Sequence, residues 1–440
     1  MCLLYCLFER IRAAIQLLTA QYGGMPLQDL PLLSVQGSML HLTKKCNKRK
    51  PTSCPSDGLE VECTPTDYIQ QCSQHHKYQR MLIRGKENDD NQFVIARRSR
   101  RKRETVSGLS WDHLPDELLL KILFYLPLQD LLKMASVCKR WHCLVFDESL
   151  WHSVDLEGLV HMGPALQQVL KTGVRQLRCP RAFVDKLHFK STGPLQVVQM
   201  DLSSSIISVA ALEGIIVSCT ELQDLSLEGL QLSDTIILSL AKNGSLKQLN
   251  ISGCSGFSSG ALEEMLKSCQ RILQLNISWC DFTSNHVKNV ARHLSPHVTH
   301  LNLSGYRENL TLDDIKVLVS RCQNIHTLDL SDSTLLMAES FPVLAQLKCL
   351  QHLSLSRCYH IHPAALSDLA KTIPSLFMLD VFGLINDSHL PALKKEMPHV
   401  SINSRPFSAI ARPTPASRGT GNYSDSAMWS RKCRLRVRLI

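Results

Sequence analysis

The sequence predicts an α/β protein in which a small module of three helices is followed by a curved solenoid of short strands and helices. The pattern apolar-x-x-apolar-x-apolar recurs eight times, about every 25 residues, between Val197 and Val381. Stretches with apolar residues at helical spacing separate the copies. A dense apolar segment from Leu109 to about Asp155 precedes them and holds three of the five tryptophans. Repeated strand and helix units bury their apolar faces only by stacking on one another.

Each copy is expected to supply one strand of the solenoid. Its apolar positions are Val197/Met200/Leu202, Leu222/Leu225/Leu227, Leu246/Leu249/Ile251, Ile272/Leu275/Ile277, Val298/Leu301/Leu303, Ile325/Leu328/Leu330, Leu350/Leu353/Leu355 and Leu376/Leu379/Val381. Irregular copies are expected at Val154/Leu156 and Val174/Leu177. Helices are predicted within 208–219, 233–242, 259–269 and 312–322, after residues that can cap them. The period resembles that of leucine-rich repeats, and it predicts a repeat domain over 156–404 with its strands on the concave side.

The helical module is predicted over 108–155. Apolar residues recur there at steps of three to five, with Pro115 near one helix start and Pro127 interrupting the pattern. A bundle of this size buries little core by itself. We therefore expect a partner to complete it.

Positive charge is concentrated in the two flanks of the chain. Residues 1–107 carry 17 basic and 10 acidic residues, residues 405–440 carry 8 and 1, and the body between them carries 24 and 28. A nucleic-acid-binding solenoid would gather Lys and Arg on its own binding face, so the net charge of +10 does not indicate DNA or RNA as a partner. Residues 1–107 lack periodicity and are expected to form a mostly disordered basic arm.

One basic run in this arm is a candidate nuclear-import signal, with a solvated tail as the alternative. Its basic residues are Arg97, Arg98, Arg100, Arg101, Lys102 and Arg103. We expect the protein in the nucleus and the cytoplasm.

The cysteines point to free thiols. The apolar opening of the chain is broken by Glu9 and Arg10 and lacks the order of a secretory signal, and no stretch approaches a membrane span. Seventeen cysteines without such a signal indicate a reducing compartment. Six recur at fixed repeat positions and are expected to be buried: Cys219, Cys254, Cys269, Cys280, Cys322 and Cys358. The evenly spaced group Cys54, Cys63, Cys72, His75 and His76 does not resemble paired metal ligands, so neither a metal nor a cofactor is expected.

The helical module resembles an F-box. The residues that carry the resemblance are 114–118 (LPDEL), 126–128 (LPL), 137–141 (VCKRW) and 150–151 (LW). Together with the strings SLEGLQLSD, LNISGCSGFS, LNLSGYRENL and LSLSRCY, the chain is similar over residues 93–440 to F-box and leucine-rich-repeat substrate receptors of cullin-RING ubiquitin ligases.

That resemblance implies that the F-box binds the S-phase kinase-associated adaptor protein 1, which joins it to cullin 1 and a RING subunit. Apolar side chains of short helices would fill a groove on the adaptor. The candidate adaptor-binding residues are Pro115, Leu118, Ile122, Leu126, Leu131, Val137 and Trp141. The alternative for each is packing inside the module, which we expect for about half of them.

The repeat register also predicts where a substrate binds. The residue between the last two apolar positions of each copy is expected to line the concave face. These residues are Asp201, Ser226, Asn250, Asn276, Asn302, Asp329, Ser354 and Asp380. Four residues after the middle apolar residue, glycine is the usual choice, but three copies have Trp279, Asp332 and Arg357 instead. Trp and Arg are enriched among residues that dominate interfaces.

Other side chains lie near these three in the sequence. Tyr306, Arg307 and Tyr359 belong to the same loops, and local packing between loops is the alternative for Trp279 and the tyrosines. The family resemblance implies that this row binds a cyclin-dependent kinase regulatory subunit, and with it a phosphorylated cyclin-dependent kinase inhibitor. It assigns this surface to Trp279, Arg307, Asp332, Arg357, Tyr359 and Phe407. It also implies that the tail, 405–440, folds back along the concave side.

The sequence therefore favours a non-catalytic receptor that holds a substrate near a ubiquitin-charged enzyme. It lacks a cysteine with a paired base and a phosphate-binding glycine loop, so no catalytic residue is assigned. One alternative is a leucine-rich-repeat scaffold that acts without a ligase. Another is a nucleic-acid-binding protein that uses its basic flanks.

Overall fold

The computed structural model describes residues 111–158, 163–184, 193–413 and 435–436. The basic arm, the import candidate from Arg97 to Arg103 and the Cys54 to His76 group lie outside these residues. The chain divides into two compact units, Met1–Leu150 and Trp151–Ile440. Each unit is described by itself.

In the first unit, three short helices follow a 3-10 turn. The turn is η2 (Trp111–His113), the helices are α4 (Asp116–Leu123), α5 (Leu128–Met134) and α6 (Lys139–Val145), and η3 (Glu148–Leu150) closes the unit. Pro115 and Pro127 directly precede α4 and α5. A backbone N–H at the start of a helix has no acceptor within the helix, so a proline there removes no hydrogen bond. The three-helix module expected from the apolar spacing is confirmed.

Arg140 of α6 binds the start of α4 and the turn before it. Its Nε donates to Asp116 Oδ1 at 2.8 Å, and one terminal nitrogen donates to the carbonyl of Asp112 at 3.1 Å. Trp141, the next residue, packs edge-on against Trp111 with ring centroids 5.8 Å apart. The half-buried Arg140 and the buried Trp141 therefore connect α6 to the start of the unit.

The second unit contains a sheet of twelve parallel strands. They are β1 (Ser153–Asp155), β2 (Gln176–Arg178), β4 (Gln199–Asp201), β6 (Asp224–Ser226), β7 (Gln248–Asn250), β8 (Gln274–Asn276), β9 (His300–Asn302), β10 (Thr327–Asp329), β11 (His352–Ser354), β12 (Met378–Asp380), β13 (Ser401–Ile402) and β14 (Leu435–Arg436). β14 pairs with β1, the first strand of the series. A separate pair joins β3 (Phe183–Val184) and β5 (Ile206–Ile207).

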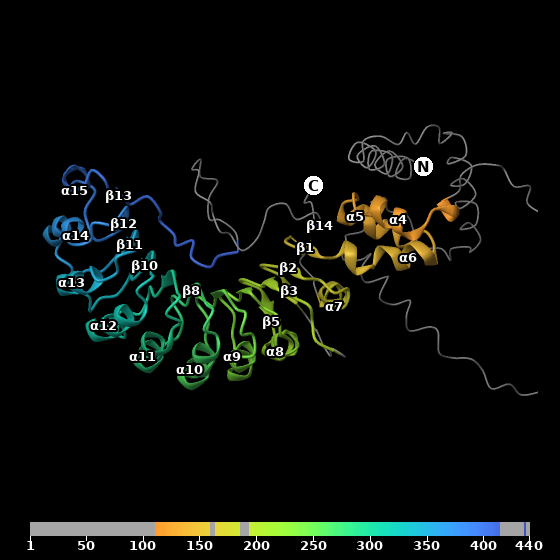
Figure 1. Cartoon of the computed structure of the whole chain (residues 1–440), viewed down its shortest axis with the longest axis horizontal. Helices are drawn as coiled ribbons and strands as arrows, with labels where there is room; N and C mark the ends of the chain where they lie inside the picture. The colour runs from red at the N-terminus through yellow and green to blue at the C-terminus, as the bar shows by residue number, and fades with distance from the viewer. Residues whose placement is uncertain (1–110, 159–162, 185–192, 414–434, 437–440) are drawn as a thin grey trace, which may run out of the picture. The chain divides into compact units, whose positions relative to one another are not determined.

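Helices lie along the outer side of this curved sheet (Figure 1). They are α7 (Gly163–Lys171), α8 (Val209–Val217), α9 (Asp234–Leu240), α10 (Ser259–Ser268), α11 (Ser284–His293), α12 (Leu312–Arg321), α13 (Phe341–Leu344), α14 (Leu366–Thr372) and α15 (Leu390–Glu396), with 3-10 turns η4 (Ala338–Ser340) and η5 (Pro363–Ala365). Ser208, Ser233 and Ser258 accept a backbone N–H at the starts of α8, α9 and α10. Each such cap contributes about 1 kcal/mol.

The predicted repeat register is confirmed. In all eight regular copies the middle apolar residue is the middle residue of a strand, and neighbouring strands pair these residues with each other, as Leu275 pairs with Leu249 and Leu301. All three are fully buried. Replacing such a leucine by alanine costs about 2–5 kcal/mol. The irregular copies also form strands, β1 and β2. Because β1 pairs with β2, the last residues of the expected 108–155 module belong to the repeat sheet.

The repeat cysteines are buried as expected. The Sγ of Cys254 and of Cys280 each lies 3.1 Å from a carbonyl oxygen of the preceding repeat, at Leu227 and Ile251. Burial raises the pKa of Cys254 to about 12 and that of Cys280 to about 11. These thiols stay protonated, so they fill space between coils and are poor nucleophiles.

Candidate functional site

A row of left-handed residues follows the strands of the solenoid. In the twelve-stranded sheet, the residue four positions after the middle of each strand from β1 to β12 has a positive φ. The row consists of Gly158, Arg181, Ser204, Gly229, Gly253, Trp279, Gly305, Asp332, Arg357 and Gly383. We call it the left-handed row. A side chain in this conformation costs about 1–2 kcal/mol, which explains why glycine is common here. Trp279, Asp332 and Arg357 occupy it with φ of 56°, 59° and 58°.

Trp279 presents its indole at the surface. The side chain is 49% exposed, and its ring lies against the Cα of Gly305 in the next repeat. The backbone N–H of Trp279 donates to the carbonyl of Ser304 at 3.0 Å, which fixes the position of the loop. Packing between loops therefore covers part of the ring and leaves the remainder open to a partner.

Asp332 and Arg357 form an ion pair with each other. Arg357 Nε donates to Asp332 Oδ1 at 2.8 Å and Nη2 donates to Oδ2. The hydrogen bond to Asp332 raises the pKa of Arg357. Within the chain, Asp332 and Arg357 therefore compensate each other's charge. A partner meets them as a fixed, planar pair.

The neighbouring aromatic residues differ in exposure. Tyr306 is buried, donates its hydroxyl to the carbonyl of Ile277 and stacks on Phe282 with centroids 5.3 Å apart. For Tyr306 the packing alternative is therefore correct. Tyr359 is exposed, as is Arg307.

The polar residues of the concave face are less accessible than expected. Asp201, Ser226, Asn250, Asn276, Asn302, Ser354 and Asp380 are buried, and Asp329 is partly exposed. Their side chains bond their own loops or neighbouring segments of the chain. For example, Asn276 Oδ1 accepts from the backbone N–H of Ser278 at 3.2 Å and from its hydroxyl at 2.9 Å. These residues mainly shape the loops, and those that remain accessible do so inside a cavity on this face.

The chain after β13 covers part of this face. The segment 403–413 runs back along the strand side of the solenoid (Figure 1). Asn276 Nδ2 donates to the carbonyl of Ile410 at 3.2 Å, and the N–H of Ala411 donates to Gln274 Oε1 at 3.2 Å. Farther along, Arg412 pairs with Glu228 at 3.4 Å. Phe407 is not held down by these contacts and is 68% exposed.

A cavity of about 230 Å³ lies between this segment and strands β9 to β12. It brings together three predicted substrate-binding residues, Trp279, Arg357 and Phe407, with His352 and Arg405. Arg307, Asp332 and Tyr359 are not part of its lining. Asp329, Asp380 and several serines also line the cavity, so its wall carries both acidic and basic side chains beside its aromatic rings.

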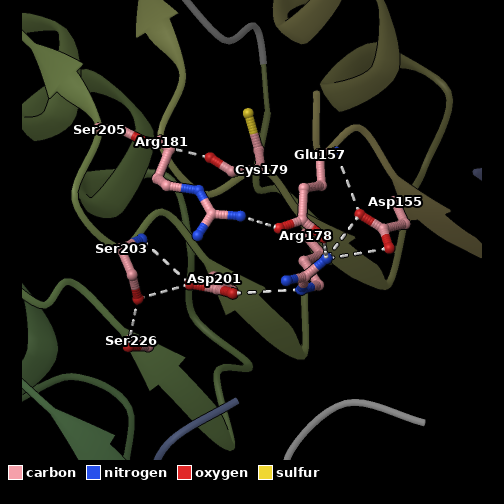
Figure 2. Close-up of polar contacts among 9 residues, drawn as sticks. All are labelled: Asp155, Glu157, Arg178, Cys179, Arg181, Asp201, Ser203, Ser205 and Ser226. Carbon is pink, nitrogen blue, oxygen red and sulfur yellow. Dashed lines mark hydrogen bonds and ion pairs between the residues drawn. The ribbon is translucent and has the colours of Figure 1, made fainter. Parts of the chain in front are cut away.

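Sequence reasoning missed a second polar cluster, near the start of the solenoid (Figure 2). Arg178 donates to both oxygens of Asp155 at 3.1 Å and to Glu157, and its Nε lies 3.5 Å from Asp201 Oδ2. Arg181, from the left-handed row, also bonds Glu157. The hydrogen bond from Arg178 lowers the pKa of Glu157, whereas burial raises that of Asp201.

This cluster borders a cavity of about 180 Å³ that Glu228 and Arg412 also line. Its arginines are largely neutralised by ion pairs with carboxylates. The cluster therefore holds the loops in place and presents little free charge to a ligand. The basic residues at repeat positions 178 and 181, opposite acidic residues at 155, 157 and 201, are the signal by which the sequence could have revealed it.

The F-box unit exposes only part of its predicted adaptor-binding set. Pro115 and Leu118 are exposed, Leu118 by 44%, and Val137 is half-buried. The remaining four are buried inside the unit: Ile122, Leu126, Leu131 and Trp141. The sequence reasoning did not single out Phe124, which is 47% exposed at the end of α4. Phe124 follows the last buried residue of α4, so helical periodicity alone did not reveal it.

Across the described ranges, no three His, Cys, Asp or Glu side chains are grouped so that they could hold a metal ion. Among those same residues, none of the helices is both long and apolar enough to cross a membrane.

Comparison with known proteins relates the chain to curated F-box and repeat proteins. F-box/LRR-repeat protein 21 of Bos taurus is 22% identical over 232 residues, which are 46% of this chain and 53% of that protein. F-box/LRR-repeat protein 12 of Homo sapiens is 51% identical over 43 residues, 10% of this chain and 13% of that protein. The chain thus spans about half the length of the first relative.

Two solved structures are also similar. The leucine-rich-repeat-containing protein LegL7 from Legionella pneumophila has a TM-score of 0.33 at 21% identity, and the match covers 51% of this chain and 80% of that one. A chain of the Rad7 and Elc1 complex from yeast has a TM-score of 0.38 at 15% identity, with 59% and 77% covered.

Two family matches cover most of the described chain. Residues 111–157 match an F-box-like domain, and residues 164–436 match the SKP2 LRR domain. The second match spans more than half of the chain and contains the left-handed row from Arg181 to Gly383. The protein therefore belongs to the SKP2 LRR domain family, and it carries an F-box ahead of its leucine-rich repeats.

Proposed function

We propose that this chain is the substrate-recognition subunit of an SCF-type cullin-RING ubiquitin ligase, of the S-phase kinase-associated protein 2 type. Its F-box binds the S-phase kinase-associated adaptor protein 1, which connects it to cullin 1 and a RING subunit. Its repeats, together with a cyclin-dependent kinase regulatory subunit, bind a phosphorylated cyclin-dependent kinase inhibitor. Polyubiquitylation and proteasomal degradation of that inhibitor then promote passage from G1 to S phase.

The observation that carries the proposal is the exposed indole of Trp279 in the left-handed row. A residue that keeps a large apolar side chain at the surface, on a backbone that disfavours it, requires a compensating role. Binding a partner supplies one, because buried tryptophans dominate interface energies. Tyr359, Arg307 and Phe407 are exposed as well and are proposed to contact the same partners.

The adaptor end is supported by the F-box match and by the exposed apolar side chains of its unit. Leu118 and Phe124 expose large apolar surfaces on α4, and Pro115 is exposed just before it. Apolar helix residues of this kind fit a groove on a partner. The chain itself supplies no chemistry in this scheme, since it acts by holding the substrate close to the ubiquitin-charged enzyme.

We further propose that the protein works in the nucleus and the cytoplasm. The support is the basic run from Arg97 to Arg103, whose composition is that of a nuclear-import signal.

The test is reconstitution with purified components. The full chain should bind the adaptor, and with the regulatory subunit it should retain the phosphorylated inhibitor but not the unphosphorylated form. Ubiquitylation of the inhibitor should require all of these components. Failure to bind the adaptor would leave a repeat scaffold without a ligase, and affinity for DNA that falls with salt would instead favour a nucleic-acid-binding role.

A further inference from the structure

We propose that Gly305 is a positioning residue that seats the indole of Trp279 for partner binding. The inference rests on the proposed function, because it assumes that Trp279 contacts the regulatory subunit. It concerns a residue that makes no such contact itself and acts only through its neighbour.

The geometry leaves no room for a side chain at position 305. A methyl group built on Gly305 would lie 2.6 Å from Cδ2, 2.9 Å from Cε3 and 3.0 Å from Cε2 of Trp279. Real Cβ atoms do not approach other heavy atoms this closely, and all three atoms belong to one rigid ring. The indole therefore lies flat over the Gly305 backbone and occupies the space that a Cβ would need.

Trp279 cannot yield by shifting its backbone. Its N–H is bonded to Ser304, next to Gly305, and its φ of 56° is already in the left-handed region. The N–H of Gly305 is in turn bonded to the carbonyl of Ser331 in the following repeat. A side chain at 305 would thus move the ring by rotating the Trp279 side chain away from the loop.

Other glycines of the left-handed row do not have a rigid ring this close to the position of a Cβ atom. At Gly253 a Cβ would meet only the Gly229 backbone, with 3.7 Å to the nearest atom, which is an ordinary contact. At Gly383 it would lie 3.1 Å from Cγ of Arg357, a flexible chain that can adjust. Gly305 is the member described here that a large, rigid side chain covers.

The experiment compares Gly305→Ala, Trp279→Ala and the double variant in the full chain. Gly253→Ala is the control for adding a methyl group at a positive φ, which is 66° there and 93° at Gly305; the double variant accounts for the remaining difference in backbone strain. Gly305→Ala should weaken binding of the purified regulatory subunit about ten-fold, whereas Gly253→Ala should change it less than two-fold. In the Trp279→Ala background, adding Gly305→Ala should weaken binding no further.

Fluorescence and stability measurements report on the position of the indole ring. The Trp279 emission, obtained as the difference between spectra with and without Trp279→Ala, should shift to longer wavelength in Gly305→Ala and become more accessible to acrylamide. Gly305→Ala should also lower the folding equilibrium constant about ten-fold more with Trp279 present than without it. This difference separates the clash with the ring from the backbone strain, which both backgrounds share.

Unchanged affinity in Gly305→Ala, with wild-type binding intact, would overturn the inference. So would additive stability effects together with an unshifted Trp279 emission. If the wild-type chain fails to bind the regulatory subunit, the proposed function is wrong. The stability comparison then decides by itself whether Gly305 seats the ring, since that measurement needs no partner.

Discussion

The guanidinium of Arg357 forms an ion pair with the carboxylate of Asp332, which lies in the preceding loop, with Nε 2.8 Å from Oδ1. Both residues have left-handed backbones, and Asp332 is buried. The two residues that break the glycine pattern in adjacent repeats thus stabilise each other. Between Trp279 and Gly383 the row presents an indole ring and an ion pair in fixed positions. Side chains that are already ordered lose less conformational entropy when a partner binds.

Replacing Arg357 is expected to lower the free energy of unfolding more than replacing a residue of an exposed ion pair. Arg357→Ala leaves the buried Asp332 carboxylate without its guanidinium, so the free energy of unfolding should fall by about 1 kcal/mol or more. The control is Lys316→Ala, which breaks an exposed pair with Asp313 and should cost less than about 0.5 kcal/mol. Urea unfolding of the two variants decides the matter. Equal losses would show that the Asp332 pair contributes no more than a surface contact.

Adaptor binding is expected to depend on exposed residues of α4. Leu118→Asp, alone or with Phe124→Asp, should abolish capture of the adaptor while the melting temperature stays within a few degrees. Ile122→Asp should instead unfold the F-box, because Ile122 is buried and its replacement places a charge in the core. Binding and thermal unfolding are measured on the same samples. Retained adaptor binding by the Leu118 and Phe124 double variant would refute the assignment of this surface.

The 403–413 segment is expected to loosen when Asn276 is replaced. Asn276→Ala removes the donor to the carbonyl of Ile410, a bond worth about 1 kcal/mol, so amide exchange within 403–413 should accelerate several-fold. Asn302→Ala is the control, since among the contacts described the side chain of Asn302 bonds only the N–H of Ser304 in its own loop. Hydrogen exchange with mass spectrometry reads both variants. Equal acceleration in the two would mean that Asn276 does not anchor the segment.

The solenoid is expected to become less stable as the pH drops, because of His300. Burial, and after it the nearby rings of His326 and His352, lowers the pKa of His300 to about 4. The unfolded chain, with a histidine pKa of about 6.5, takes up a proton first as the pH drops. The protonated side chain therefore favours the unfolded state, and the contribution is lost between about pH 6.5 and 4.

His300→Gln provides the comparison. The difference in unfolding free energy between the wild type and this variant should shrink by about 2–3 kcal/mol from pH 7.5 to 4.5. Taking the difference removes the pH-dependent contributions of groups that do not interact with His300. A difference that does not change with pH would contradict the lowered pKa of the partly buried His300.

The strands were predictable because their signal is local and repeated. Leu225, Leu249, Leu275 and the other middle residues fall at the centre of observed strands, since only a buried position demands an apolar residue in every copy. Helix starts followed in the same way from capping residues such as Ser208 and Ser233. Glycine at fixed positions similarly marked the left-handed row and its exceptions, including Trp279.

Exposure and pairing were harder to predict. Asn276 was expected to line an open concave face, but the segment from 403 to 413, more than 100 residues away in sequence, bonds its side chain. The family resemblance implied that the tail returns along this side, whereas the periodicity of the repeats did not. The Asp332 and Arg357 pair depends on a contact between repeats that periodicity does not encode. In the F-box, Ile122 and Trp141 share an amphipathic pattern with Leu118, so the pattern alone could not separate core from surface.

The central claim is that one chain carries two separable contact surfaces. The most direct test is affinity purification of the full chain with and without Trp279→Ala, with quantification of adaptor, cullin 1, regulatory subunit and phosphorylated inhibitor by mass spectrometry. We expect Trp279→Ala to reduce regulatory subunit and phosphorylated inhibitor together, by about 30-fold or more, while adaptor and cullin 1 stay at wild-type levels. Undiminished recovery of the inhibitor, or a parallel loss of the adaptor, would contradict the account.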